Sequence, residues 1–361
     1  MADEDLDALL ICAHGASGRG RIRYVSDVYL WGGQTFVILP RNQSPVMIQP
    51  AYVGSGWAES VGWIKDNRAA VDPGRGAAEV LREMGMSRAA IGVVGLGSDI
   101  APRDVRTIES VLPTAMLHDA TLTFDMVRIV KSEEEIGHLR SMSAVLLRAY
   151  EALEQVLKPG VTEREVIAQA IHEAYLYGCL DGFAHISRSG GLHVQHPPTN
   201  DIIWESDSMT VDLEYIGPEG YALELARCYS FHPPPDAARR VYDVQVEVFA
   251  RCMEVMQPGN SSYRIFEAAD AAYRQRGFYA AGPSGHGPVQ LHAHGIGLGF
   301  DEPPGVPGLD IMLRPGMVVC LHPHLGPEDP MLPDISIEDT ILITEHGPER
   351  LTDQQDRWRV L

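Results

Sequence analysis

Residues 291–298 read Leu-His-Ala-His-Gly-Ile-Gly-Leu, and the segment Asp-Glu-Pro-Pro follows closely at residues 301–304. Two further segments, residues 209–227 and 314–343, carry polar side chains inside apolar, strand-like runs. Together the three segments offer two imidazoles and three carboxylates, a set that can hold a metal ion or move protons. These five residues are Asp212, Glu224, His294, His322 and Glu338. Because they come from separate strand-like runs, we expect a folded sheet to gather them into one site.

The composition indicates a soluble globular protein. The chain has 361 residues, enough for more than one domain, and its formal net charge of -20 is opposite to that of surfaces that bind nucleic acid or anionic membranes. The five cysteines are scattered without a C-x-x-C pair, which is typical of a reduced protein. The acidic N-terminus lacks the basic and apolar regions of a signal peptide, so we expect a cytoplasmic location.

The first third of the chain is predicted to be an α/β domain covering residues 1–124. Apolar, β-prone runs alternate with stretches of helical periodicity and are separated by turn residues. The strand-like runs are residues 8–11, 35–39, 45–48, 91–94 and 117–121, and the helical stretches are residues 74–84 and 104–111.

Residues 125–361 are predicted to form an α+β domain made of two similar halves. Ser132 and Glu135 form a capping-box pattern that opens a long helix, and a Lys-Pro-Gly turn at residues 158–160 separates it from a second helix. The same order of helix, Pro-Gly turn and helix returns at residues 238–276. Each copy precedes a strand-rich stretch, which indicates duplicated helix-strand halves.

Two carboxylates lie on the arms of a predicted hairpin within residues 209–231. Asp212 and Glu224 stand in apolar runs on either side of a Gly-Pro-Glu-Gly turn, and we expect them to face one another. Buried carboxylates require a cation, a shared proton or a basic partner. With the imidazoles of His294 and His322, the donor set suits Zn, Mn, Fe or Co.

Several blocks of the second domain resemble the pita-bread family, which includes methionine aminopeptidase, proline dipeptidase, aminopeptidase P and creatinase. The resemblance covers about residues 125–350, and the first third fits the family's N-terminal domain mainly through Ile-Arg-Tyr-Val-Ser at residues 22–26. It implies a pita-bread catalytic domain behind a smaller creatinase-type α/β domain, and a homodimer. The matching blocks are residues 127–135, 158–163, 294–297, 314–318 and 337–340.

The resemblance also implies metal ligands at Asp212, Glu224, His294, His322 and Glu338, but this chain departs from the peptidases at several positions. Glu224 stands where they have Asp, His322 where they have Glu, and Asp301 where they usually have His. Ser336 likewise replaces a familiar Arg. Three carboxylates instead of four disfavour two divalent ions. The sequence therefore leaves one ion (Mn, Fe, Co or Zn) or none, and it predicts no organic cofactor.

The leading hypothesis is a creatinase-like or ectoine-type hydrolase that cleaves a C–N bond, amide or amidine, of a small polar substrate. His196 is the expected proton shuttle, and Glu224 and Glu338 would orient water or hold a cationic substrate. His193 is the fallback shuttle. The expected substrate-binding residues are Arg23, Tyr24, His193 and Asp301.

Three alternatives remain beside this hypothesis. The first is a metal-dependent Xaa-Pro dipeptidase or aminopeptidase, and the second is a lyase or oxidative enzyme with a single metal ion held by two His and one carboxylate. The third is a binding module without enzymatic activity. The five retained ionisable groups argue against a binding module, because binding alone does not require them.

Overall fold

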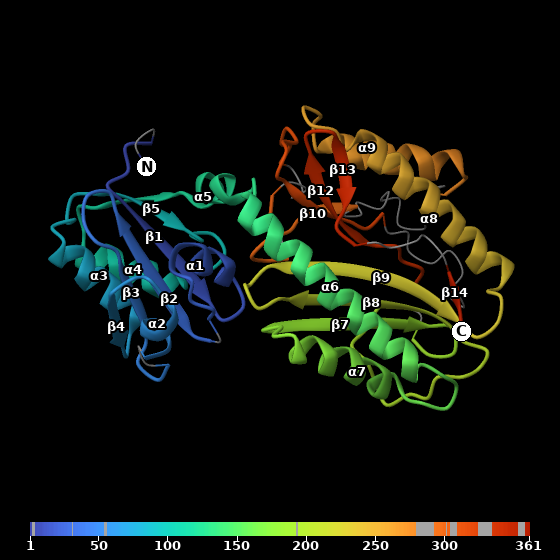
Figure 1. Ribbon diagram of the computed structural model, residues 1–361. Helices are drawn as coiled ribbons and strands as arrows, with labels where there is room; N and C mark the ends of the chain where they lie inside the picture. Colours follow the sequence, from blue (N-terminus) through green and yellow to red (C-terminus); the bar gives the residue numbers. More distant parts are fainter. Residues whose placement is uncertain are drawn as a thin grey trace. The chain divides into compact units, whose positions relative to one another are not determined.

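The computed structural model describes most of the chain, which folds into two compact units (Figure 1). The units are Met1–Arg128 and Ile129–Leu361. No helix within the described residues is both long and apolar enough to cross a membrane. The described residues are 1, 4–30, 32–53, 56–192, 194–278, 292–300, 302–303, 309–323, 334–352 and 358–361.

The first unit is built on a six-stranded mixed sheet in the order β4-β3-β2-β1-β5-β6. Strand β1 is antiparallel to β2 and parallel to β5, which confirms the predicted α/β character of this part. The strands are β1 Ala8–His14, β2 Gln34–Pro40, β3 Val46–Pro50, β4 Asp66–Ala70, β5 Ala90–Val94 and β6 Met116–Asp119. The helices are α1 Arg19–Ser26, α2 Gly56–Val61, α3 Pro73–Glu83, α4 Pro102–Val111 and α5 Thr121–Arg128.

Apolar side chains cover both faces of this sheet because neighbouring strand residues point to opposite sides. Leu10 belongs to one buried cluster with residues of α3 and α4, whereas Ile11 belongs to another with residues of α1 and α2. A largely buried ion network lies on the same side of the sheet as α1. In this network Arg21 contacts Asp99 at 2.6 Å and Asp125 at 2.7 Å.

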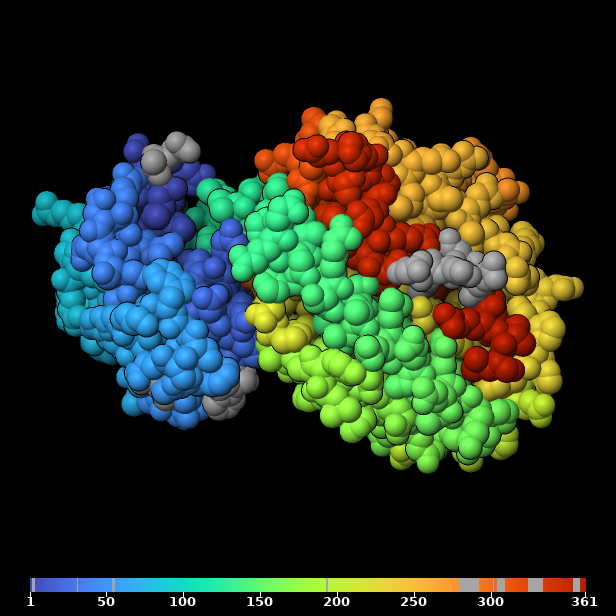
Figure 2. Space-filling view, in the orientation of Figure 1, coloured from blue at the N-terminus to red at the C-terminus, as the bar shows by residue number. Residues whose placement is uncertain are grey.

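The second unit begins with a helix pair, α6 Glu133–Val156 and α7 Glu163–Leu176. Both helices start with capping boxes, at Ser132 as the sequence predicted and also at Thr162. Helix α6 packs on β8 and β9, and the buried Tyr150 hydroxyl donates to the backbone oxygen of Val211 at 3.0 Å. The outer side of α6 is visible as a green band in Figure 2.

A second helix pair, α8 Asp236–Val255 and α9 Tyr263–Gln275, runs beside another sheet in Figure 1. Each helix pair thus precedes a sheet, in agreement with the predicted helix-strand halves. One sheet has the order β14-β9-β8-β7 and the other β10-β11-β12-β13. The strands are β7 Asp181–Arg188, β8 Ser208–Ile216, β9 Ala222–Ser230, β10 Ala293–Gly295, β11 Val318–Leu321, β12 Asp339–Thr344, β13 Gly347–Arg350 and β14 Arg359–Val360.

The two sheets of the second unit meet along residues 334–338. Ser187 on β7 donates to the backbone oxygen of Asp334 at 2.9 Å, and Ala226 on β9 forms an isolated bridge with Glu338. The sequence predicted strand-like runs within residues 314–343, and in the structure β12 begins only at Asp339. The preceding residues leave the ladder because they contact the neighbouring sheet instead.

Candidate functional site

One face of the β7-β8-β9 sheet carries a concentration of carboxylates. In the antiparallel β8-β9 register, Asp212 is opposite Ala226 and Glu214 is opposite Glu224. Directly paired residues share a face, and so do residues two apart on one strand. Asp212 and Glu224 are therefore diagonal neighbours on the same face. This corrects the expectation that they face one another directly: the residue opposite Glu224 is Glu214.

Strands β10 and β11 bring imidazoles and a thiol to these carboxylates. His294 Nε2 lies 3.2 Å from Glu224 Oε2, and the rings of His294 and His322 are 5.0 Å apart between centroids. Cys320 is paired with His294 across β10 and β11, and its Sγ donates to Glu338 Oε1 at 3.4 Å. The five residues expected from the sequence thus lie on elements that meet, as predicted.

Burial of these charged groups destabilises the folded state in the absence of a cation. The exposed fractions are 2% for Asp212, 3% for Glu224, 6% for Glu338 and 8% for His294, while His322 is half-buried. Asp212 Oδ1 and Glu224 Oε1 are buried and accept no hydrogen bond from any described residue. Buried anionic oxygens without donors are costly, and a metal ion is one of the partners that removes the cost.

The raised pKa values of two buried acids, Asp212 and Glu338, also indicate an excess of negative charge in the cluster. Burial raises the pKa of Asp212 to about 6, and the nearby Glu224 adds to the rise while His185 and His294 oppose it. The pKa of Glu338 lies well above its ordinary value, first because of burial and then because of the charges of Asp212 and Glu224. Both shifts indicate a place that favours either a proton or a cation.

The residues present fit a transition-metal ion. Carboxylates and imidazoles together suit Zn, Mn, Fe or Co better than Mg or Ca. Donor atoms of Glu224, His294 and Cys320 all lie within 4.8 Å of one another. Burial and the neighbouring acids raise the pKa of Cys320 well above its ordinary value, so its sulfur is a neutral thiol unless a cation replaces the proton.

Two residues of the cluster, His185 and Glu214, were not predicted from the sequence. His185 on β7 is paired with Asp212, and its Nδ1 lies 3.8 Å from Asp212 Oδ2 and 3.6 Å from Glu214 Oε1. Glu214 could have been predicted from strand periodicity, because it is two residues beyond Asp212 and so lies on the same face of the strand. His185 had no such signal, since β7 was not predicted as a strand.

His196, the expected proton shuttle, lies on a different side of the sheet. It bridges Ile186, whose side chain points away from the face of His185. Its Nδ1 lies 2.9 Å from the backbone oxygen of Pro197 and 3.9 Å from Glu163 Oε2 at the start of α7. The described contacts of Nδ1 thus place His196 beside the start of α7, and its role as proton shuttle stays a prediction.

The remaining predicted residues are not part of the described cluster. Arg23 and Tyr24 belong to α1 of the first unit, where Tyr24 packs edge-on against Phe124 at 6.0 Å. Their role in substrate binding stays a prediction. His193 and Asp301 lie outside the described residues.

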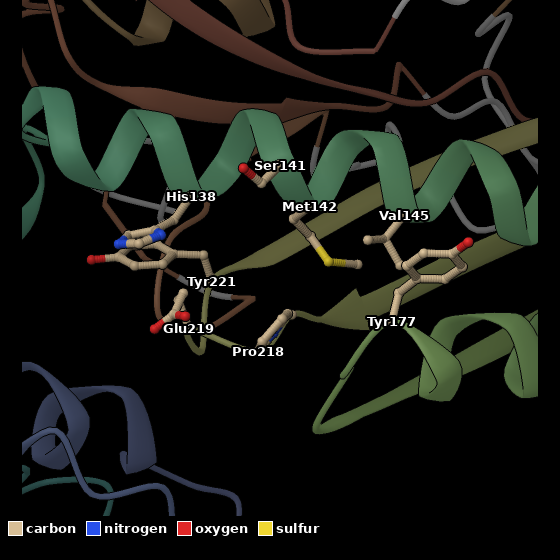
Figure 3. A pocket seen from close by; sticks show the side chains of 9 residues that line it. His138, Ser141, Met142, Val145, Tyr177, Pro218, Glu219 and Tyr221 are labelled. Atoms are coloured by element: carbon tan, nitrogen blue, oxygen red, sulfur yellow. The ribbon is translucent and has the colours of Figure 1, made fainter. Parts of the chain in front are cut away.

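A separate cavity of about 250 Å³ lies beside α6 at the β8-β9 turn (Figure 3). The ring of Tyr221 stacks on His138 with centroids 5.8 Å apart, and its hydroxyl donates to Glu135 at 2.8 Å. None of the cluster residues lines this cavity, so it is not the opening of the candidate site. Its lining is His138, Ser141, Met142, Val145, Tyr177, Gly217, Pro218, Glu219 and Tyr221.

Comparison with solved structures identifies the same architecture over nearly the whole chain. The prolidase from Pyrococcus horikoshii superposes with a TM-score of 0.82, covering 99% of this chain and 97% of that one at 20% sequence identity. The Xaa-Pro dipeptidase from Bacillus anthracis superposes with a TM-score of 0.80 at 20% identity, covering 99% of this chain and 96% of that one. At this level of identity the likeness shows the fold alone.

Sequence relatives agree with the structural neighbours. An Xaa-Pro dipeptidase of Pyrococcus furiosus is 28% identical over 232 residues, which are 63% of this chain and 64% of that protein. An uncharacterized peptidase of Staphylococcus aureus is 28% identical over 238 residues, which are 65% of each chain. The matched stretch is therefore just under two thirds of the length of these relatives.

The family model described as Metallopeptidase family M24 matches residues 137–345. This match covers more than half of the chain and includes all five ligand positions expected from the sequence. The structural neighbours confirm the expected pita-bread fold, with a smaller α/β domain N-terminal to it in the sequence. The chain therefore belongs to metallopeptidase family M24.

Proposed function

We propose that this chain is a metal-dependent hydrolase that cleaves C–N bonds in small substrates, with Xaa-Pro dipeptides as the first substrate class to consider. The observation that carries the proposal is the convergence of Asp212, Glu224 and His294 with two buried carboxylate oxygens that lack described donors. The two sequence relatives, an Xaa-Pro dipeptidase and an uncharacterized peptidase, support this substrate class.

The side chains of the cluster would hold the ion and orient the reactants. Asp212, Glu224, His294 and Glu338 are the residues that would bind it. A bound divalent ion polarises a carbonyl group and lowers the pKa of water to near neutrality. The surrounding burial excludes bulk solvent, so hydrogen bonds and charges directed at the scissile amide act in a low-dielectric environment.

Proton transfer to the leaving nitrogen requires a group that can exchange protons near neutral pH. His322 is the half-buried imidazole of the cluster, and it stands where the family resemblance places a Glu in peptidases. We therefore assign this role to His322 rather than to His196, whose described contacts are with Pro197 and Glu163. A His suits the task because its ordinary pKa is close to 6.5.

A second candidate keeps the reaction type and changes the substrate. Glu224 and His322 depart from the peptidase pattern, and the acidic face with Glu214 could hold a cationic group such as an amidine. This observation favours a creatinase-like C–N hydrolase. In that case the acids would neutralise the positive charge of the substrate instead of the charge of a metal ion.

A substrate panel separates the two candidates. The full-length chain is freed of metal with a chelator, reconstituted with Mn²⁺, Co²⁺ or Zn²⁺, and incubated with Gly-Pro, Ala-Pro, Gly-Leu and creatine. Metal-dependent release of proline, with little cleavage of Gly-Leu, would support the peptidase. Metal-independent cleavage of creatine would favour the creatinase-like candidate, and no C–N cleavage across the panel would overturn the peptidase proposal.

The assembly and location expected from the sequence also remain proposals. We propose a cytoplasmic homodimer, on the basis of the family resemblance and the cysteine pattern. All five cysteines are buried and free, which is compatible with a reducing compartment. Light scattering of the purified chain tests the dimer, since a monomer at micromolar concentration would contradict it.

A further inference from the structure

We propose that His185, Asp212 and Glu214 form a second divalent-cation subsite, adjacent to the cluster of Glu224, His294 and Cys320. His185 and Glu214 lie outside the five positions at which the family resemblance implies ligands. The inference concerns which residues of this chain hold an ion. It shares with the proposed function only the assumption that the chain binds metal.

The spacing of the three donor atoms fits an ion better than direct hydrogen bonds. His185 Nδ1 is 3.6 Å from Glu214 Oε1 and 3.8 Å from Asp212 Oδ2. Hydrogen bonds of this type are about 2.7–3.2 Å long. Ligands bound at about 2.0–2.2 Å around one ion lie about 3.0–3.6 Å apart, so small side-chain movements would complete the site.

The charge distribution supplies the driving force. Glu214 is directly opposite Glu224, and Asp212 is the diagonal neighbour of Glu224 on the same face. Like charges in directly opposed positions destabilise a sheet. Glu338 adds a fourth carboxylate, whose charge interacts with those of Asp212, Glu224 and Glu214. A second cation on this face would relieve the repulsion among all four groups.

A second observation points to a ligand at this subsite. Asp212 is 2% exposed, and its Oδ1 accepts no hydrogen bond from the described residues, while Oδ2 of the same carboxylate is directed to His185. A buried carboxylate with a vacant acceptor requires a positive partner. The imidazole of His185 indicates a transition metal, because Mg²⁺ and Ca²⁺ sites use oxygen ligands.

The subsite is open on one side for exchange of the ion. The side chain of His185 is 30% exposed and that of Glu214 is 15% exposed. Phe183 lies beside His185 with ring centroids 5.4 Å apart, and Phe300 lies 5.1 Å from Phe183. These rings form an apolar border on one side of the imidazole.

Glu214 and His185 also change the balance of ligands that the sequence indicated. The sequence showed three carboxylates and two imidazoles, which disfavoured two divalent ions. With Glu214 the cluster has four carboxylates, and with His185 it has three imidazoles. Glu214 on β8 thus supplies the carboxylate that is missing because His322 stands where the peptidases have Glu.

Metal stoichiometry tests the inference without substrate. The metal-free full-length chain is titrated with Co²⁺ by calorimetry, and its metal content is measured by mass spectrometry after gel filtration. We expect two ions in the wild type and one in His185→Ala and in Glu214→Gln, with the Kd of the lost ion weakened more than about 10-fold. The Co²⁺ absorption bands should change in His185→Ala, because one nitrogen ligand is removed.

His232→Ala and Glu219→Gln are matched controls, since both residues are exposed and lie outside the cluster. Both should keep two ions. One ion in the wild type, or two ions with unchanged Kd in both cluster variants, would overturn the inference. If His185→Ala does not fold, Glu214→Gln decides, because it removes repulsion without changing shape. Two ions in a chain that cleaves no C–N bond would contradict the proposed function alone.

Discussion

Glu214 and Glu224 occupy directly opposite positions on β8 and β9, with their side chains on the same face of the sheet. Two carboxylates in such a pair repel each other unless a proton or a cation lies between them. Asp212 and Glu338 extend the acidic region, and His294 contacts it at 3.2 Å from Glu224. This relationship makes the stability of the sheet dependent on what the cluster binds.

The first prediction concerns that repulsion. Glu214→Gln removes one of the opposed charges and keeps the shape of the side chain. In the presence of a chelator we expect the free energy of unfolding to increase by about 0.2–1 kcal/mol, measured by urea denaturation at pH 7.5. Glu219→Gln at the exposed β8-β9 turn is the control. An equal increase in the control, or a loss of stability in Glu214→Gln, would refute the repulsion argument.

The second prediction concerns the buried imidazole. His294→Ala removes the nitrogen nearest to Glu224, so the ion held by these residues should be lost. We expect kcat/KM for Gly-Pro to fall by more than about 100-fold, beyond the effect typical of residues that only orient a ligand. His232→Ala, an exposed substitution on the surface, should retain activity. Full activity of metal-free His294→Ala would be incompatible with the proposed role.

The third prediction concerns a buried ion network between β7 and α7. Arg188 is 1% exposed and contacts Glu163 and Asp207 at 2.6 Å each. Arg188→Ala leaves two buried acids without their cation, so we expect a loss of about 3–5 kcal/mol in the free energy of unfolding. Arg251→Ala removes an exposed pair with Glu254 and should cost less than about 1 kcal/mol. Chemical denaturation of both variants checks the difference.

The fourth prediction is a pH dependence of stability. Burial raises the pKa of Asp334 to about 7, and the charge of Asp212 contributes to the rise. The folded state therefore holds a proton that the unfolded state releases near its ordinary pKa of about 3.9. This contribution is complete below about pH 4 and is lost as the pH rises towards 7, by up to about 4 kcal/mol.

Asp334→Asn isolates this contribution from those of the other buried acids. With chelator present, unfolding curves between pH 5 and 8 should show a steeper loss of stability in the wild type than in Asp334→Asn. Parallel curves would mean that Asp334 does not bind its proton more tightly in the folded state.

Sequence patterning located the elements that have strong local signals. The capping box at Ser132 predicted the start of α6, and the Gly-rich turn at residues 217–220 predicted the β8-β9 hairpin. Helix α1 was missed because it starts after Gly18 in the left-handed region without a capping side chain. Such a start has no side-chain signature in the sequence.

The site was predicted only in part, because some of its residues lie in local motifs and others depend on long-range strand pairing. Asp212, Glu224 and His294 lie in motifs, so the sequence could identify them. His185 depends on the register between β7 and β8, a long-range pairing that local patterns do not specify. The face that the side chain of His196 occupies likewise depends on a long-range pairing, its bridge to Ile186.

The most direct test of the account is anomalous diffraction from crystals of the full-length chain grown with Zn²⁺. We predict a peak within about 2.0–2.2 Å of donor atoms of Glu224 and His294, and a second peak at the same distance from Asp212 and His185. Absence of anomalous density at the Glu224–His294 cluster would contradict the claim that this chain is a metal-dependent hydrolase.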